Sequence, residues 1–91
     1  MIGLSVEVNW AGEVLTLPIS PRAAVNFERH FGMALSKAIS EDGKFEHLYY
    51  LAWECVRLSG RVVKPFDGWL EEVKSAKFVV DEEPAPLDVT G

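Results

Sequence analysis

The chain has 91 residues, of which 48% are hydrophobic and 25% charged, and its formal net charge is −5. This hydrophobic fraction is enough for a core in one small domain, which we place at residues 1–80, and it excludes a chain that is disordered throughout. The nine Lys and Arg residues are scattered singly along an acidic chain. This argues against a nucleic-acid surface, because phosphate binding needs clustered positive charge.

Cysteine content and hydropathy set further limits. A single Cys excludes an internal disulfide and fits a reducing compartment such as the cytoplasm. No apolar run approaches the roughly 20 residues that a membrane span needs, and the first residues do not form a signal-peptide pattern. We therefore expect a soluble, intracellular protein without a membrane segment.

Residues 2–19 alternate between apolar and polar side chains and predict a β-hairpin. The side chains of Leu4, Val6 and Val8 project from the same face of an extended strand. The alternation resumes after Gly12, a residue that favours a turn. An isolated hairpin is only marginally stable in water. The hairpin must therefore pack on helices or gain a strand from a neighbouring chain.

Ser20 and Pro21 predict the start of a helix over about residues 21–39. Ser accepts hydrogen bonds from first-turn amides, and Pro loses no hydrogen bond at the first helical position. An apolar stripe that includes Phe27 and Phe31 follows one side of this helix. We expect this side to face the core.

Two residues break the regularity of this first helix. Gly32 interrupts it and marks either a kink or a place where another backbone comes close. Glu28 lies at the edge of the apolar stripe, so its carboxylate should find a hydrogen-bond donor. It is either partly exposed or buried in a pair with Arg or Lys.

The helix expected at residues 44–59 has apolar side chains around roughly 220° of its circumference, about twice the arc of an ordinary surface helix. The apolar positions are Phe45, Leu48, Tyr49, Leu51, Ala52, Trp53, Cys55, Val56 and Leu58, and the remaining arc holds Glu46, His47, Tyr50, Glu54 and Arg57. Such a helix must be covered from two sides, by the rest of the chain or by a partner. Leu48, Ala52 and Val56, together with Phe27 and Phe31, are the predicted core.

A third helix, over about residues 65–75, follows from apolar residues at i, i+3, i+4 and i+7. The segment 77–80 is either a β segment added to the hairpin or extended chain. Residues 81–91 contain four acids and two prolines and predict a flexible acidic tail. Together these elements predict an α+β fold, with an N-terminal β-hairpin followed by about three helices.

The sequence contains no recognisable catalytic or cofactor motif. Cys55 lies within the apolar arc of the central helix, where a free Cys behaves as a small hydrophobic residue. His30 and His47 are expected on the polar faces of two different helices, without the further ligands that a metal site needs. We therefore predict a protein that is not an enzyme and that uses no metal or cofactor.

The aromatic residues point instead to protein binding. Three Trp, five Phe and two Tyr are more than one small core can enclose, and Trp10 is expected at the hairpin turn. Trp and Tyr are frequent anchors of protein interfaces. The predicted contact residues are Tyr50, Trp53, Phe66 and Trp69.

Three segments together resemble a known family. These are FERHFG at 27–32, EHLYYLAWECVRLSGRVV at 46–63 and PFDGWLEEV at 65–73, followed by an acidic tail with prolines. In this order they are similar to the small tail assembly chaperones of long-tailed phages and prophages of actinobacteria. The similarity covers about residues 20–90, and the hairpin matches in pattern only.

The resemblance implies a specific role in the host cytoplasm. Such chaperones bind the long, apolar, helical tape measure protein, keep it soluble and help to recruit tail tube subunits, and they tend to self-associate into spirals or filaments. The alternative from another class is a small structural head–tail connector or tail-completion protein that stays in the virion. The family supplies no catalytic residues to carry over.

Overall fold

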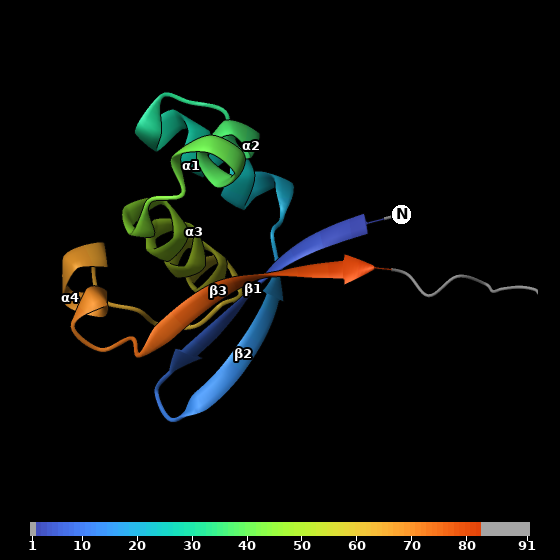
Figure 1. Cartoon of the computed structure of the whole chain (residues 1–91). Helices are drawn as coiled ribbons and strands as arrows, with labels where there is room; N and C mark the ends of the chain where they lie inside the picture. The colour runs from blue at the N-terminus through green and yellow to red at the C-terminus, as the bar shows by residue number, and fades with distance from the viewer. Residues whose placement is uncertain (1, 83–91) are drawn as a thin grey trace, which may run out of the picture.

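A three-stranded antiparallel sheet carries the helices on one of its faces (Figure 1). The computed structural model describes residues 2–82. The elements in chain order are β1 Ile2–Trp10, β2 Glu13–Pro18, α1 Pro21–Phe31, α2 Leu35–Lys37, the π-helical turn η1 Ala38–Asp42, α3 Phe45–Leu58, α4 Phe66–Leu70 and β3 Ser75–Glu82. Figure 1 shows α3 between the sheet and α1. The predicted α+β fold class is confirmed.

β1 and β2 form the predicted hairpin. The register pairs Trp10 with Glu13 and leaves Ala11 and Gly12 as a two-residue turn. Both turn residues have positive φ, 56° and 79° respectively. Two successive positive φ angles match the right-handed twist of the flanking strands, so this short turn closes the hairpin without splaying it.

β3 completes the sheet and lies on the other side of β1. The strand order is β2-β1-β3, with Val6 opposite Phe78 and Val8 opposite Ala76. The segment 77–80, for which the sequence allowed two interpretations, is therefore a β segment. The hairpin gains its third strand from its own chain, which removes the marginal stability of an isolated hairpin.

The two faces of the sheet differ in polarity, because directly opposed residues in an antiparallel sheet share a face. The face toward the helices holds Leu4, Val6, Val8, Trp10, Leu15, Leu17, Ala76, Phe78 and Val80. The opposite face is mixed, and its residues are Ser5, Glu7, Asn9, Val14, Thr16, Pro18, Ser75, Lys77 and Val79. On this face Glu7 and Lys77 form a cross-strand ion pair at 3.6 Å. The apolar face therefore packs on α3.

The predicted helix over residues 21–39 is wrong in its extent. It begins as expected, with Ser20 Oγ accepting a hydrogen bond from Ala23 N–H at 3.2 Å. It ends at Phe31, because Gly32 takes the left-handed conformation and donates its N–H to Glu28 O at 2.8 Å. The chain then restarts as α2 and η1, so Gly32 marks a break rather than a kink.

Gly32→Ala is expected to destabilise the protein by about 1–2 kcal/mol, which is the cost of a left-handed conformation for a residue with a Cβ. A Cβ at this position would meet nothing within 4 Å, so the cost is confined to the backbone. Gly68→Ala is the matched control, because Gly68 lies within α4 and a Cβ there would come no closer than 3.4 Å to Lys64. Urea denaturation of both variants checks this, and equal midpoints would contradict it.

α3 spans Phe45–Leu58, close to the prediction of 44–59, and Gly60 beyond its end has φ 99°. The third helix was predicted over 65–75, but α4 is only five residues long, Phe66–Leu70. The chain leaves the helix there because β3 begins at Ser75, and Lys74 N–H donates to Asn9 O at 2.8 Å. Sheet formation therefore overrides the helical periodicity of these residues.

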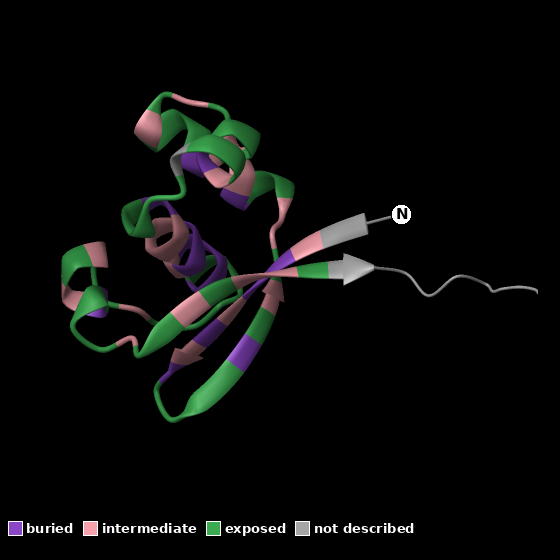
Figure 2. Ribbon diagram, viewed as in Figure 1, coloured by how far each residue is buried: buried purple, intermediate pink, exposed green. Residues whose placement is uncertain are grey.

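The core lies between the sheet, α1 and α3 (Figure 2). Of the predicted core residues, Phe27, Ala52 and Val56 are fully buried, whereas Phe31 and Leu48 are partly buried. The tail was predicted from residue 81, but β3 continues to Glu82. The rest of the predicted tail, 83–91, lies outside the described residues.

Candidate protein-binding surface

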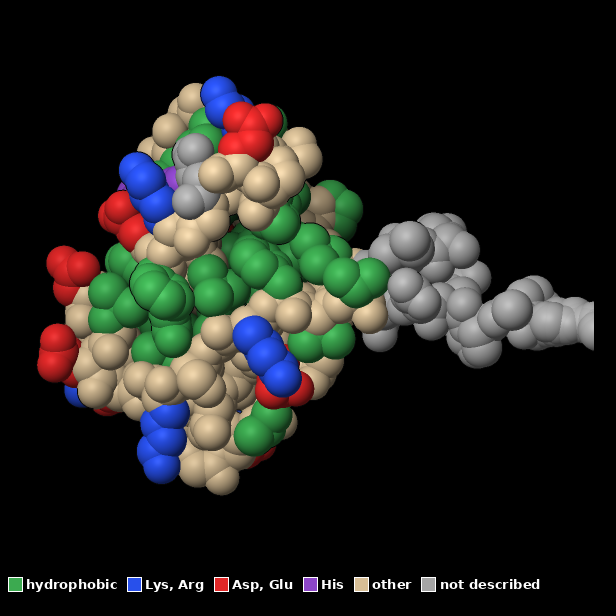
Figure 3. All heavy atoms as spheres, viewed as in Figure 1, with side chains coloured by type: hydrophobic (Ala, Val, Ile, Leu, Met, Phe, Trp, Pro, Cys, Tyr) green, Lys and Arg blue, Asp and Glu red, His purple; other side chains and the backbone are tan. Residues whose placement is uncertain are grey.

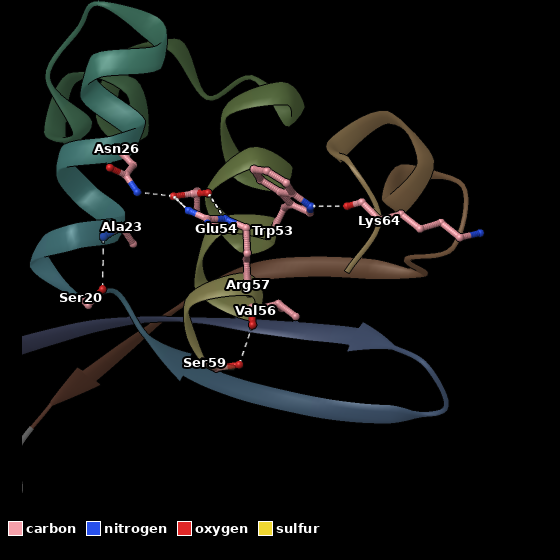
Figure 4. A network of polar contacts seen from close by, with 9 residues as sticks. All are labelled: Ser20, Ala23, Asn26, Trp53, Glu54, Val56, Arg57, Ser59 and Lys64. Atoms are coloured by element: carbon pink, nitrogen blue, oxygen red, sulfur yellow. Dashed lines mark hydrogen bonds and ion pairs between the residues drawn. The ribbon is translucent and has the colours of Figure 1, made fainter. Parts of the chain in front are cut away.

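Three of the four predicted contact residues form one aromatic cluster. The ring centroids of Tyr50 and Trp53 are 5.5 Å apart, those of Tyr50 and Phe66 5.4 Å, and those of Trp53 and Phe66 5.8 Å. All three side chains are half-buried. Trp53 Nε1 donates to Lys64 O at 2.9 Å, which ties α3 to the segment before α4 (Figure 4). The cluster fixes α4 against α3 and leaves part of each ring at the surface.

Trp69, the fourth predicted contact residue, is completely buried, and this part of the prediction needs correction. α4 turns Trp69 inward, where its ring centroid lies 6.3 Å from that of Trp10. The exposed large apolar residue of α4 is instead its neighbour Leu70. Trp10 is also buried and donates its Nε1–H to Glu72 Oε1 at 3.3 Å. Neither Trp10 at the hairpin turn nor Trp69 in α4 is therefore presented to a partner.

Glu54 is at the centre of a polar network that the sequence did not reveal (Figure 4). Its side chain is 2% exposed, and it accepts hydrogen bonds from Asn26 Nδ2 at 2.6 Å, Arg57 Nε at 2.8 Å and Arg57 Nη2 at 3.1 Å. The Arg57 guanidinium lies 5.6 Å from the centre of the Trp53 ring. The i, i+3 spacing of Glu54 and Arg57 was the one signal available in the sequence.

Ionisation of Glu54 is favoured by these partners. Burial alone would raise its pKa, but the hydrogen bonds from Arg57 and Asn26 outweigh burial and lower the pKa below its ordinary value. The charge of Glu54 in turn adds to burial in raising the pKa of Tyr50. The network therefore joins α1 to α3 through a carboxylate that is kept charged.

The predicted exposure of His47 is wrong, whereas His30 is exposed as expected. His47 is 7% exposed and lies edge-on to Phe27 at 5.6 Å and to Phe31 at 4.6 Å. His30 stacks on Tyr50 with ring centroids 4.2 Å apart. His47 is buried because α1 packs on the side of α3 that the helical wheel had assigned to solvent.

Because α1 packs on the side of α3 that was expected to face solvent, apolar side chains on another side of α3 lie at the surface. Phe45, in the first turn, is 78% exposed. Around it lies a contiguous set that we call the apolar band, which consists of Leu35, Ile39, Phe45, Leu48, Tyr49, Phe66, Leu70, Phe78 and Val80. Figure 3 shows hydrophobic side chains gathered across this face of the molecule. A band contributed by five elements is larger than the scattered apolar residues of an ordinary surface.

Two hollows adjoin each other within the band, and Phe45 lines both. The first is a pocket of about 180 Å³ between α2, η1, the start of α3 and β3, lined by residues that include Leu35, Leu48 and Phe78. The second, of about 230 Å³, is shallower and lies between α3 and α4, with Tyr49, Phe66 and Leu70 in its lining. The sequence predicted Phe66 as a contact residue, whereas it assigned Phe45 only to the apolar arc of the central helix.

The environment of Cys55 makes its thiol unreactive in the folded protein. Burial, followed by the charge of Glu54, raises the pKa of its thiol to about 12. We therefore expect Cys55 in the folded protein to resist a thiol-reactive aromatic disulfide at about pH 8, where an ordinary thiol reacts readily. The reaction is followed by absorbance, with the chain in guanidinium chloride as the control. Rapid labelling without denaturant would contradict this expectation.

The described residues, 2–82, show neither a metal-binding cluster nor a helix suited to span a membrane. Within residues 2–82, no three His, Cys, Asp or Glu side chains come together as a metal ion would require. Within the same range, no helix combines the length and the apolar character needed to cross a membrane.

Comparisons of the chain with protein-family models, with curated proteins and with solved structures found no match. The family resemblance of residues 20–90 therefore stays a prediction from the sequence. The apolar band and its two hollows are the structural features that bear on function.

Proposed function

We propose that this protein is a tail assembly chaperone of a long-tailed phage or prophage. In the host cytoplasm it binds the tape measure protein, keeps it soluble and helps to recruit tail tube subunits. The apolar band is the observation that carries this proposal. The resemblance of residues 27–32, 46–63 and 65–73 to such chaperones supplies the identity of the client.

The band suits a client that exposes apolar surface. The chain already has a buried core of its own, and Phe45, which is 78% exposed, is not part of that core. Covering such a patch with a partner removes apolar area from water at a gain of about 25 cal/mol per Å². The formal net charge of −5 opposes aggregation of the complex.

The titratable groups inside the fold support a binding role rather than a catalytic one. Glu54 is engaged by Asn26 and Arg57, and the thiol of Cys55 is buried with a high pKa. A catalytic acid or nucleophile needs access to substrate and a pKa near the working pH. Glu54 instead holds α1 and α3 together through its hydrogen bond with Asn26.

Self-association is part of the proposal and is supported by the sheet. Within residues 2–82, β2 and β3 each pair with β1 on one side only, so each has an outer edge. Edge strands present backbone N–H and C=O groups to which another strand can pair. Pro18 lacks an N–H and weakens the edge of β2, which makes β3 the better candidate.

Co-expression with the protein encoded just downstream tests the proposal. We expect that long protein to be soluble with this chain and to precipitate without it. Equal precipitation in both cases would contradict a chaperone role. Mass spectrometry of mature virions then separates the alternative, since a chaperone is absent from the particle whereas a head–tail connector remains in it.

A further inference from the structure

We infer that the apolar band binds one amphipathic α-helix of the client in a single orientation. The N-terminal end of that helix lies over the hollow between α3 and α4, and its C-terminal end lies over the pocket beside α2. This inference rests on the proposed function and adds to it the kind of segment that is bound, the surface that binds it and its direction.

The shape of the band argues for a row of large apolar side chains on the ligand. Phe45 lines both hollows, which places them next to each other. The pocket of about 180 Å³ is comparable to the apolar cavity of roughly 150 Å³ that accepts a benzene ring. Each hollow therefore has room for about one large side chain. A helix presents such a row on one face at i, i+3, i+4 and i+7.

The backbone chemistry of the band favours a helix over an extended peptide. The hollow between α3 and α4 is lined by residues of two helices, and no strand edge is among its lining residues. An extended peptide there would leave its own N–H and C=O groups without partners, at a cost for each group that is buried. A helix brings its backbone hydrogen bonds with it and needs only side-chain contacts.

The charges at the two ends set the direction. Glu46 and Asp67 line the hollow between α3 and α4, whereas Lys44 lines the pocket beside α2. A helix carries a partial positive charge at its N-terminus and a partial negative charge at its C-terminus. With its N-terminus near the two carboxylates and its C-terminus near Lys44, both ends of the bound helix are stabilised. The reverse orientation places like charges together at both ends.

Photocrosslinking tests the orientation in the full chain, co-expressed with the downstream client. A photoreactive phenylalanine analogue replaces Leu70 at one end of the band or Leu35 at the other, and Val62 serves as the control because it is 94% exposed and lies outside the band. Peptide mapping by mass spectrometry identifies the client residues that are captured. We expect both band positions to capture the same client helix, with the Leu70 product nearer its N-terminus, and Val62 to capture none of it.

The opposite order of crosslinks would overturn the orientation. Crosslinks only between copies of this chain would show that the band is a self-association surface and would overturn the inference as a whole. The whole inference is also overturned if the client stays soluble but neither band position captures it. Failure of the unmodified chain to keep the client soluble contradicts the proposed function itself, and the inference falls with it.

Substitution at the centre of the band provides an independent measurement. Phe45→Glu should reduce the soluble client by about tenfold or more, because it removes a large apolar contact and adds a charge. Val62→Glu makes the same change in charge at a site outside the band and should leave client solubility within about twofold. Both residues are highly exposed, so both variants should keep the far-UV circular dichroism and thermal midpoint of the parent. Equal client solubility with the two variants would overturn the inference.

Discussion

Replacement of Trp69 by Ala is expected to lower the free energy of unfolding by about 3–5 kcal/mol, the range for deleting a fully buried Trp side chain. Trp69 is 0% exposed and packs against Trp10, so its removal leaves a cavity between α4 and the hairpin. Domains of this size have total stabilities of about 5–15 kcal/mol. The substitution therefore removes a large part of the stability of the chain. Guanidinium denaturation followed by far-UV circular dichroism measures the change.

Two further substitutions separate cavity formation from other effects. Phe45→Ala truncates an aromatic side chain that is 78% exposed and should change the stability by less than about 0.5 kcal/mol. Trp69→Phe should cost much less than Trp69→Ala, because it keeps most of the ring. It also removes an indole N–H that is buried and has no hydrogen-bond partner among the described residues. Similar losses for all three variants would contradict the burial of Trp69 in the structure.

Local sequence signals predicted the parts of the fold that depend on neighbouring residues. Alternation placed the hairpin, Ser20 and Pro21 fixed the start of α1, and the long apolar run located α3 to within one residue at each end. These signals act through strand pleating and through satisfaction of helix-end amides, which need no knowledge of distant partners. Gly32 was recognised as an interruption, but not as the end of α1.

Features set by tertiary contacts were not predictable from these signals. β3 was ambiguous because its four central residues carry no clear period, and only pairing with β1 makes the segment a strand. The face of α3 that is buried depends on where α1 and the sheet approach it. His47 and Glu54 lie within that contact, whereas Phe45 projects beyond it in the first turn of the helix.

The candidate site was also predictable only in part, because it depends on both local sequence and tertiary contacts. Tyr50, Trp53 and Phe66 are brought together because α4 folds back on α3, which the aromatic content suggested but did not specify. From the sequence we expected the over-wide apolar helix to be covered either by the rest of the chain or by a partner. In the structure the sheet and α1 cover most of that helix, so the exposed apolar surface comes from Phe45 and from residues of other elements. This moves the expected contact surface toward the N-terminal end of α3.

Glu54→Gln is expected to destabilise the protein by about 1–3 kcal/mol near neutral pH, the range for a hydrogen bond to a charged group together with the cost of donors left unpaired. Gln keeps the volume of Glu but is uncharged, and its amide offers one oxygen where the carboxylate offers two. The larger cost of breaking a fully buried ion pair does not apply, because the Arg57 side chain is 42% exposed and can bind water. Glu46→Gln, at an exposed position of the same helix, should change stability by less than about 0.5 kcal/mol.

The pH dependence of this loss distinguishes the charge of Glu54 from its shape. The folded-state pKa of Glu54 is lowered relative to its ordinary value of 4.5, so its ionised form stabilises the folded state. That contribution is fully present above the ordinary value and is lost as the pH falls through the lowered pKa of the folded state. The difference in stability between the parent and Glu54→Gln should therefore be constant above about pH 6 and shrink below about pH 4. If this difference in stability stayed constant down to acid pH, Glu54 would act through packing rather than through its charge. Only an ionisable side chain can make the stability of the contact between α1 and α3 depend on pH.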